Sequence, residues 1–330
     1  MSEHHSHVHP LEEGNGKPRG TTSWDGSITA VGSEMESYYG RPILKEPVWK
    51  PEIPAYFFFG GLAGASSVLH LGARLAGNDR LARTSLLVGA AGDLISPPLL
   101  ISDLGRPERF LNMFRVFKVT SPMSVGSWVL LVSGGASSTA AALELVGRLP
   151  KLKAAAEVVA ALFGPPLATY TGTLLANTAI PVWHEGRREL PWLFGASASA
   201  SAGAAAAAFT ATSSAGPARR LAVLGAAAEL GLMETMKKRC GFVGEVYDQG
   251  TAGKLARASK LCTAAGGMLL ATRAKHSRAA AVAGGALVLA GGMALRWSVY
   301  RAGFQSAKDP RYTVIPQRER KRAREAAAGS

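Results

Sequence analysis

The chain has 330 residues, of which 47% are apolar and only 18% are charged, and its formal net charge is +14 at pH 7. The charges are segregated, so that most intervals of about twenty residues, the length that a bilayer core requires, hold at most one or two of them. This pattern predicts a membrane-embedded protein with basic loops. It argues against a nucleic-acid-binding surface, because no basic domain with interspersed aromatics stands apart from the apolar runs.

The N-terminal region divides into two parts. Residues 1–37 are rich in Gly, Ser and His and contain no apolar core of a cleavable signal peptide, so we expect a disordered polar leader. Its histidines could hold a metal only adventitiously. Residues 38–53 contain too many prolines for a helix and too many aromatics for a free linker. We therefore expect an extended arm that lies on another surface of the protein.

Long apolar runs follow the arm. Segments of this length must be helical, because lipid offers no partner to an exposed backbone amide. The predicted fold class is thus all-α, a polytopic integral membrane protein with about eight transmembrane helices. The segment 190–212 is rich in Ala and Ser and is expected to be an interior helix. The expected spans are 54–76, 82–102, 122–147, 154–181, 190–212, 217–236, 255–273 and 277–303.

An even number of spans places both ends of the chain on one side of the membrane, here called side A. The arm, the segment 103–121, the turn 180–189 and the loop 237–254 then share side A, whereas the connections on the opposite side, side B, are short and basic. Residues 304–330 form a basic C-terminal tail, and its basic run from Arg318 to Arg324 is expected in solvent or against anionic lipid. The charge distribution does not decide which side is cytoplasmic.

The connection 103–121 is longer than a helical hairpin needs, and it alternates arginines with aromatic residues between flanking prolines. This excess of charged and aromatic residues indicates a docking surface for a partner or a lid over a site.

Ionisable residues inside the spans are candidates for function, because each is costly in hydrocarbon. Asp93 lies near the middle of the second expected span, Glu229 lies near the middle of the sixth, and His70 lies toward side B in the first. Together with hydroxyl groups they could relay protons, or they could pair with each other and with arginines to hold helices together. The other members of this set are Glu144, Glu157, Arg296, Tyr170, Thr171 and Thr173.

Metal-ligand patterns are absent from the sequence. A bis-histidine haem needs two facing imidazoles within the membrane, and only His70 is clearly placed there. Cys240 and Cys262 form no CxxC pair or four-thiolate set, and no P-loop or dinucleotide fingerprint is found. We therefore expect no haem, no iron–sulfur cluster and no metal site in this chain, so any redox centre belongs to a partner.

Several motifs, taken in order between about residues 49 and 185, resemble the NrfD/polysulfide reductase (PsrC-like) membrane-subunit family. The motifs are Trp49-Lys-Pro-Glu-Ile-Pro, Asp103-Leu-Gly-Arg-Pro-Glu-Arg-Phe, Ser121-Pro-Met-Ser-Val-Gly-Ser-Trp, Tyr170-Thr-Gly and Pro181-Val-Trp. Beyond about residue 190 the resemblance rests on helix count and charge placement.

The resemblance implies eight helices in two four-helix bundles, at 54–181 (the quinone-site half) and 182–303. It also implies a membrane anchor in the bacterial plasma membrane that exchanges electrons and protons with the quinone pool, menaquinone or ubiquinone. The implied partners are a ferredoxin-like four-cluster iron–sulfur subunit and, behind it, a molybdopterin catalytic subunit or a multihaem cytochrome.

The implied quinone site lies between the first and fourth helices, and Tyr170 is the favoured hydrogen-bond donor to the quinone. The family's Asn and His early in the first helix have no counterparts here, where Phe and Gly occupy that stretch. Asp103, Arg106 and Arg109 are expected to fix the loop and dock the partner, with Trp49 of the arm. The implied lining of the site is Tyr56, Phe58, Gly60, Gly61 and Tyr170.

Two alternatives from other classes remain open. One is a proton-translocating or transporter-like module that uses Asp93 and Glu229, which would require broken helices in symmetric repeats. The helix-interrupting pairs Pro97-Pro98 and Pro165-Pro166 both fall in the first half of the chain, so this symmetry is not evident. The other is a purely structural anchor. The terminal substrate of the complex and the direction of electron flow are set by the partner subunits.

Overall fold

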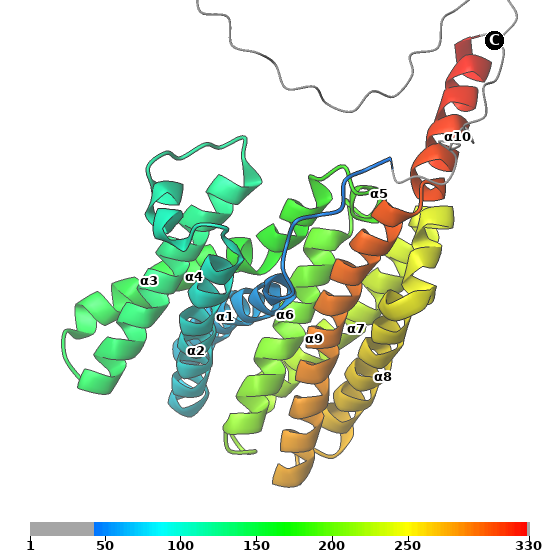
Figure 1. The fold of residues 1–330 in the computed structure, drawn as a ribbon. Coiled ribbons are helices and arrows are strands. Elements are labelled where there is room, and N and C mark those ends of the chain that lie inside the picture. Colours follow the sequence, from blue (N-terminus) through cyan, green and yellow to red (C-terminus); the bar gives the residue numbers. More distant parts are fainter. Residues whose placement is uncertain (1–42, 329–330) are drawn as a thin grey trace, which may run out of the picture. The chain divides into compact units, whose positions relative to one another are not determined.

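The structure is a computed structural model that describes residues 43–328. The expected leader, residues 1–37, and the start of the arm lie outside the described residues. Within residues 43–328 every regular element is a helix, which confirms the all-α class (Figure 1). The elements are α1 (Glu52–Leu75), α2 (Asp79–Asp103), the 3₁₀ helix η1 (Pro107–Phe114), α3 (Pro122–Val146), α4 (Pro150–Ala176), α5 (Pro181–Glu185), α6 (Leu190–Phe209), α7 (Gly216–Cys240), the 3₁₀ helix η2 (Gly241–Asp248), α8 (Gly250–Thr272), α9 (Arg278–Lys308) and α10 (Arg311–Ala328).

Each of the eight expected spans coincides with a long helix, but the helices differ in how well they suit a bilayer. In the described part of the chain, five helices are long and apolar enough to cross a membrane, namely α1, α2, α3, α4 and α9. The protein is therefore a multi-pass membrane protein. Because α6, α7 and α8 are not among the five, the count of eight spans stays a prediction. Helix α9 runs to Lys308, past the expected end at residue 303, and most of the basic tail forms α10.

Local sequence signals explain where these helices begin and end. The side chain of Asn78 accepts a hydrogen bond from the Leu81 amide at the start of α2, at 3.2 Å. Ser277 does the same for Ala280 at the start of α9, also at 3.2 Å. Such caps satisfy amide groups that the first helical turn leaves unpaired. Gly147 ends α3 in the left-handed conformation, with φ of 70°, where a side chain would be strained.

Helix α1 lies at the centre of the packing. It contacts α2, α4, α6 and α9, and its close approach to α4 depends on glycine. A Cβ atom at Gly64 would lie 2.4 Å from the carbonyl oxygen of Gly164. Helix α6 is buried along almost its whole length through Ala, Ser and Gly residues, as expected for an interior helix.

The arm and three connections meet on one side of the protein, which confirms the expected side A arrangement (Figure 1). The Lys50 amide donates to Asp103 Oδ1 at 2.7 Å, which joins the arm to the end of α2. The Trp49 ring stacks on Trp183 of α5, with 5.5 Å between ring centroids. Arg239, near the end of α7, bonds to the carboxylate of Glu189 after α5. The arm, the end of α2, the α5 turn and the end of α7 are therefore connected to one another.

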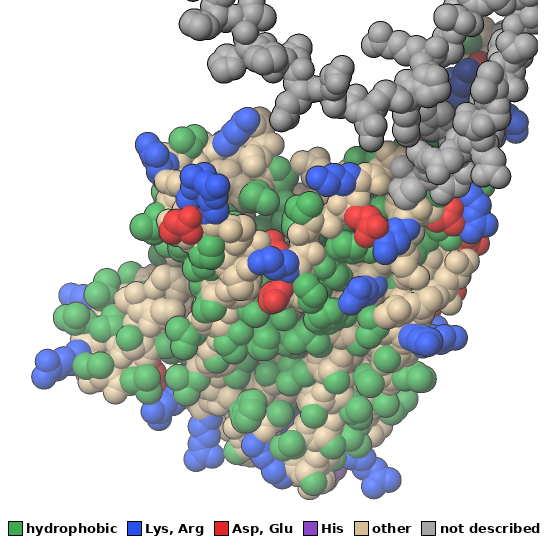
Figure 2. Space-filling model, in the orientation of Figure 1, with side chains coloured by type: hydrophobic (Ala, Val, Ile, Leu, Met, Phe, Trp, Pro, Cys, Tyr) green, Lys and Arg blue, Asp and Glu red, His purple; other side chains and the backbone are tan. Residues whose placement is uncertain are grey.

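Hydrophobic side chains form a band across the middle of the face drawn in Figure 2, with Lys and Arg side chains above and below it. This distribution is typical of a protein whose middle lies in hydrocarbon and whose ends reach water.

Candidate functional site

The expected quinone donor, Tyr170, lies on α4 against the start of α3. A Cβ atom at Gly126 would lie 2.1 Å from Cε2 of the Tyr170 ring, so the ring occupies the space that a side chain at this position would need. Tyr170 is only partly buried, as are Leu99, Leu100 and Val125, which pack against the same hydrophobic cluster. The ring therefore has an apolar surrounding that is still partly open to the outside.

Helix α1 contributes Tyr56 to the same cluster. The Tyr56 side chain is buried, and its hydroxyl has no hydrogen-bond partner among the described residues. Gly60 lies one turn further along α1. A Cβ atom at Gly60 would lie 3.9 Å from the Tyr56 ring and 3.7 Å from the Ser96 hydroxyl of α2. A buried hydroxyl without a partner is unusual and is able to donate to a ligand. Tyr56 and Tyr170 thus belong to the same hydrophobic cluster, Tyr56 as a buried member and Tyr170 packed against it.

The two other expected lining residues lie elsewhere. Phe58 faces α9, where its ring would be 3.3 Å from a Cβ atom at Gly292. Gly61 faces α6 and α9, with Ala198 and the Arg296 guanidinium as its nearest neighbours. The reason is helical periodicity, because residues four apart share a face whereas residues two or five apart do not. Four well-formed cavities in residues 43–328 are lined neither by Tyr56 nor by Tyr170.

Asp93 lies in the middle of α2 and is 3% exposed. The carboxyl group has no cation partner within the described residues, and the Ser137 hydroxyl lies beside it. The side chain faces α3, where an added Cβ at Gly134 would be 3.5 Å from Asp93 Oδ1. Buried hydroxyls without partners continue toward side B. They belong to Ser66, Ser85, Ser133 and Ser137.

His70 lies at the side B end of the first four long helices, in a charged cluster. Its Nδ1 is 2.7 Å from the carbonyl oxygen of Ala82, and its Nε2 is 3.2 Å from Glu157 Oε1. Arg74 bonds to the other carboxyl oxygen of Glu157, which is 1% exposed. Lys153 bonds to Glu144 beside them. These residues line a cavity of about 290 Å³. The cluster joins α1, α3 and α4 by ion pairs, and it leaves His70 next to a carboxylate.

Glu229 and Arg296 form a second buried polar group, among α6, α7, α8 and α9. Glu229 Oε1 accepts a hydrogen bond from the Thr263 hydroxyl at 2.9 Å, and Ser197 lies beside the same carboxyl group. Arg296 is 1% exposed, donates to the Phe194 carbonyl at 2.9 Å and lies over the Phe194 ring at 3.9 Å. Arg296 interacts electrostatically with Glu229. The structure therefore places a cation near Glu229, but gives none to Asp93 among the described residues.

The four expected docking residues fall into two pairs. Asp103 and Trp49 hold the arm in place, through the Lys50 amide and the Trp183 ring. Arg106, just before η1, and Arg109, within it, are exposed. Next to them an aromatic cluster, Phe110, Phe114, Phe117 and Trp128, supports the segment 103–121 by edge contacts with centroids 5.3–6.2 Å apart. Two exposed arginines therefore lie on a segment that aromatic contacts support.

Sequence reasoning missed the residues that complete the two charged groups. Arg74 is 83 positions from its partner Glu157, and Thr263 is 34 positions from Glu229. Nothing in the local sequence links these pairs, because both depend on which helices are neighbours. Within residues 43–328 no group of three or more His, Cys, Asp or Glu residues could hold a metal ion.

Long apolar helices, carboxyl groups buried between them and elaborate loops on one side define a polytopic helical membrane protein. Residues 43–237, more than half of the chain, match the family described as polysulphide reductase, NrfD. The chain therefore belongs to the NrfD family, whose members are membrane subunits of quinone-linked oxidoreductases and assemble with other oxidoreductase subunits. A comparison with curated proteins gave no match.

Proposed function

We propose that this chain is a quinone-reactive membrane anchor subunit, which exchanges electrons and protons between the quinone pool and a partner iron–sulfur subunit. The observation that carries the proposal is the apolar region shared by Tyr170 and the unpartnered hydroxyl of Tyr56. A quinone needs an apolar surface for its ring and tail and a donor at its carbonyl oxygens. Tyr56 supplies a free donor, and Tyr170 supplies a second hydroxyl at the partly exposed edge.

The proposed architecture is eight transmembrane helices in two four-helix bundles, α1–α4 and α6–α9. In support, α1 packs on α2 and α4, α3 packs on α2 and α4, and the same pattern recurs among α6, α7, α8 and α9. The bacterial plasma membrane is the proposed location. Helix α6 would cross the bilayer largely shielded by protein, which relaxes its need for an apolar surface.

The proposed partner on side A is a ferredoxin-like four-cluster iron–sulfur subunit, which serves a molybdopterin enzyme or a multihaem cytochrome. The exposed Arg106 and Arg109 on the aromatic-supported segment favour this side. Electrons pass between the partner and the quinone, either menaquinone or ubiquinone, and Tyr56 and Tyr170 hold the quinone headgroup near the docking surface. Protons move to or from the quinone oxygens as it is reduced or oxidised.

The test is quinone turnover by the purified membrane complex carrying Tyr56→Phe or Tyr170→Phe. Each variant removes one hydroxyl, and we expect a loss of roughly tenfold or more for a donor to the reacting oxygen. Thr169→Val is the matched control, because Thr169 adjoins Tyr170 but bonds only to the carbonyls of Pro165 and Pro166. Unchanged turnover and unchanged inhibition by quinone analogues in both tyrosine variants would contradict the proposal.

The variant Asp93→Asn distinguishes the two alternative functions, a proton-translocating module and a purely structural anchor. A proton-translocating module would lose proton movement while quinone turnover continued, because Asp93 is buried without a cation partner among the described residues. A purely structural anchor would tolerate Asp93→Asn and Tyr170→Phe with no change in either activity.

A further inference from the structure

The Glu229 carboxyl group lies at the inner end of a cavity of about 120 Å³ between α7, η2, α8 and α9. Glu229 is 2% exposed, whereas the side chains at the other end are open to the surface, with 62% exposure for Lys260 and 61% for Asp248. This volume is sufficient for several water molecules. We call this cavity the η2 port. Its lining is Glu229, Leu230, Met233, Glu234, Lys237, Tyr247, Asp248, Ala256, Arg257, Ser259, Lys260 and Leu295.

Polar atoms without partners gather at the inner end of the η2 port. Glu229 Oε2 and the Tyr247 hydroxyl, whose residues line the port, have no hydrogen-bond partner among the described residues. Two nitrogens of Arg296, which interacts with Glu229 but is not among the lining residues, also have none. Buried polar groups are almost always paired, so water in the port is the expected partner for those that line it. Burial raises the pKa of Tyr247 well above its ordinary value, so that its hydroxyl stays protonated and donates to such a water.

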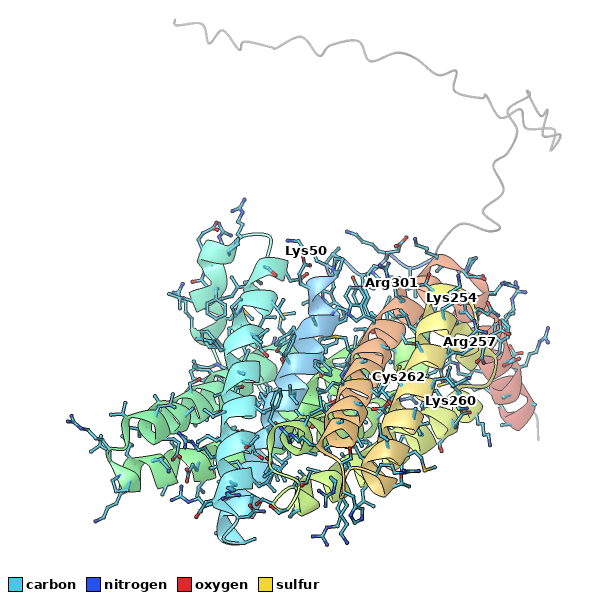
Figure 3. All side chains as sticks on the ribbon, turned by 90° about the horizontal axis from the view of Figure 1, so that it is seen from below. Lys50, Lys254, Arg257, Lys260, Cys262 and Arg301 are labelled. Atoms are coloured by element: carbon cyan, nitrogen blue, oxygen red, sulfur yellow. The ribbon has the colours of Figure 1, made fainter. Side chains whose placement is uncertain are left out.

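The outer end of the η2 port is lined by ion pairs. Lys237 bonds to Asp248 at 2.5 Å, and Lys260 bonds to Glu234 at 2.8 Å. Lys260 lies ten residues into α8, about 15 Å along the helix axis at 1.5 Å per residue, so this pair is deeper than an ordinary loop salt bridge. Exposed charges at such a depth are costly in hydrocarbon but not in water. Figure 3 shows Lys254, Arg257 and Lys260 spaced along α8.

From these observations we infer that the η2 port is a water-filled route by which protons pass between side A and Glu229. A hydronium ion in the port gives its proton to Glu229 Oε2 and remains as water, and release is the reverse step. Arg296 stabilises the ionised carboxylate, while Thr263 and Ser197 hold its position. The inference extends beyond quinone chemistry and does not depend on it. The groups that face Glu229 or its port are Ser197 from α6, Glu234 and Lys237 from α7, Tyr247 and Asp248 from η2, Arg257, Lys260 and Thr263 from α8, and Arg296 from α9.

The first experiment tests whether the port contains water. Ala256→Cys places a thiol in the port wall, and Leu261→Cys places one on the exposed apolar side of α8, where Leu261 is 70% exposed. Native membranes are treated with a charged, membrane-impermeant thiosulfonate, and modified peptides are identified by mass spectrometry. We expect modification at position 256 at least roughly tenfold faster than at 261, because the charged reagent attacks the ionised thiolate in water. Equal rates, or no modification at 256 while denatured protein reacts, would overturn the inference.

The second experiment tests whether the port carries protons. The infrared band of the protonated Glu229 carboxyl, identified by its loss in Glu229→Gln, is followed over a pH series and on transfer into D₂O. Ala256→Leu fills the port, whereas Ala258→Leu adds the same volume at an exposed position outside it. We expect Ala256→Leu alone to slow deuterium exchange, by roughly tenfold or more. Equal exchange in both variants, or no Glu229 band at any pH, would overturn the inference. Neither readout involves quinone turnover, so failure here is distinct from failure of the proposed function.

Discussion

The helices α1–α4, the first group, and the helices α6–α9, the second group, differ in which side chains they expose and which they bury. The first group presents large apolar side chains outward, such as Leu94 and Leu162, which are 74% and 68% exposed. The second group buries its small residues against one another and leaves charges such as Lys260 exposed on α8. Four of the five helices that suit a bilayer by composition belong to the first group.

The two groups also differ in where their buried carboxyl groups lie and in whether a cation is near them. In the first group, Glu157 is held by Arg74 at the side B end, and Asp93 is left without a cation partner among the described residues. In the second group, Glu229 and Arg296 lie together well inside the protein. The first group therefore presents apolar surface suited to lipid, whereas the second group holds a carboxyl group and a guanidinium in its interior.

The largest expected effect on the free energy of unfolding comes from a substitution in the second group. Arg296→Met removes the cation beside Glu229 and should lower the free energy of unfolding by about 3–5 kcal/mol, the usual cost of leaving a buried charge alone. The double variant Arg296→Met with Glu229→Gln should recover much of this loss. Thermal unfolding in detergent measures both. A single variant as stable as the double variant would mean that Glu229 is not charged in the folded protein.

The next largest effect on stability is expected for the charged cluster around Glu157, at the side B end of the first group. Glu157→Ala leaves Arg74 and His70 without their carboxylate and should cost about 3 kcal/mol. Glu144→Ala is the matched control, because Glu144 pairs with Lys153 in a more exposed position and should cost at most about 1 kcal/mol. The same unfolding measurement applies. Equal losses would show that the cluster is solvated and that its charges are not distinguished by burial.

A smaller effect on stability is expected at the contact between Gly126 and Tyr170 in the first group. Gly126→Ala forces the Tyr170 ring to move and should cost about 1–3 kcal/mol as well as lower quinone turnover. Gly135→Ala on the same helix has nothing within 4 Å of the added Cβ and should be neutral or slightly stabilising. Quinone turnover that is unchanged in Gly126→Ala would argue against a role for the Tyr170 position.

The smallest effect on stability is expected for the exposed arginines of side A. Arg106→Ala and Arg109→Ala should change the free energy of unfolding by less than about 0.5 kcal/mol, since both side chains are exposed. They should nevertheless weaken retention of the partner subunit during purification. Lys151→Ala, exposed on side B, serves as the control and should leave retention unchanged. Loss of stability without loss of the partner would assign these arginines to the fold.

Much of the fold follows from the sequence, because an apolar run of bilayer length leaves the backbone no alternative to a helix. The interior position of α6 also follows, since its Ala and Ser residues offer little to lipid. The tail could not be predicted in this way. Tyr312, which docks α10 through a hydrogen bond to Glu245, has no distinguishing pattern around it.

The candidate sites were predictable in part, for a physical reason. A carboxylate within an apolar run is conspicuous, so Asp93 and Glu229 stand out from the sequence alone. Their surroundings depend on contacts between helices that are distant in the chain, such as Gly134 with Asp93 or Thr263 with Glu229. The family resemblance implies that Phe58 and Gly61 line the site together with Tyr56, but helical periodicity turns them to other neighbours.

The hydrogen bond from the Tyr300 hydroxyl to the Trp49 carbonyl joins residues that are 251 positions apart. A ribosome makes Trp49 long before Tyr300, so this contact of the arm can form only after the last long helix, α9, has been made. Side A is consequently finished only when synthesis of the chain is nearly complete. A truncated or misinserted chain would present a loose arm, and a partner that requires the seated arm would select full-length subunits during assembly.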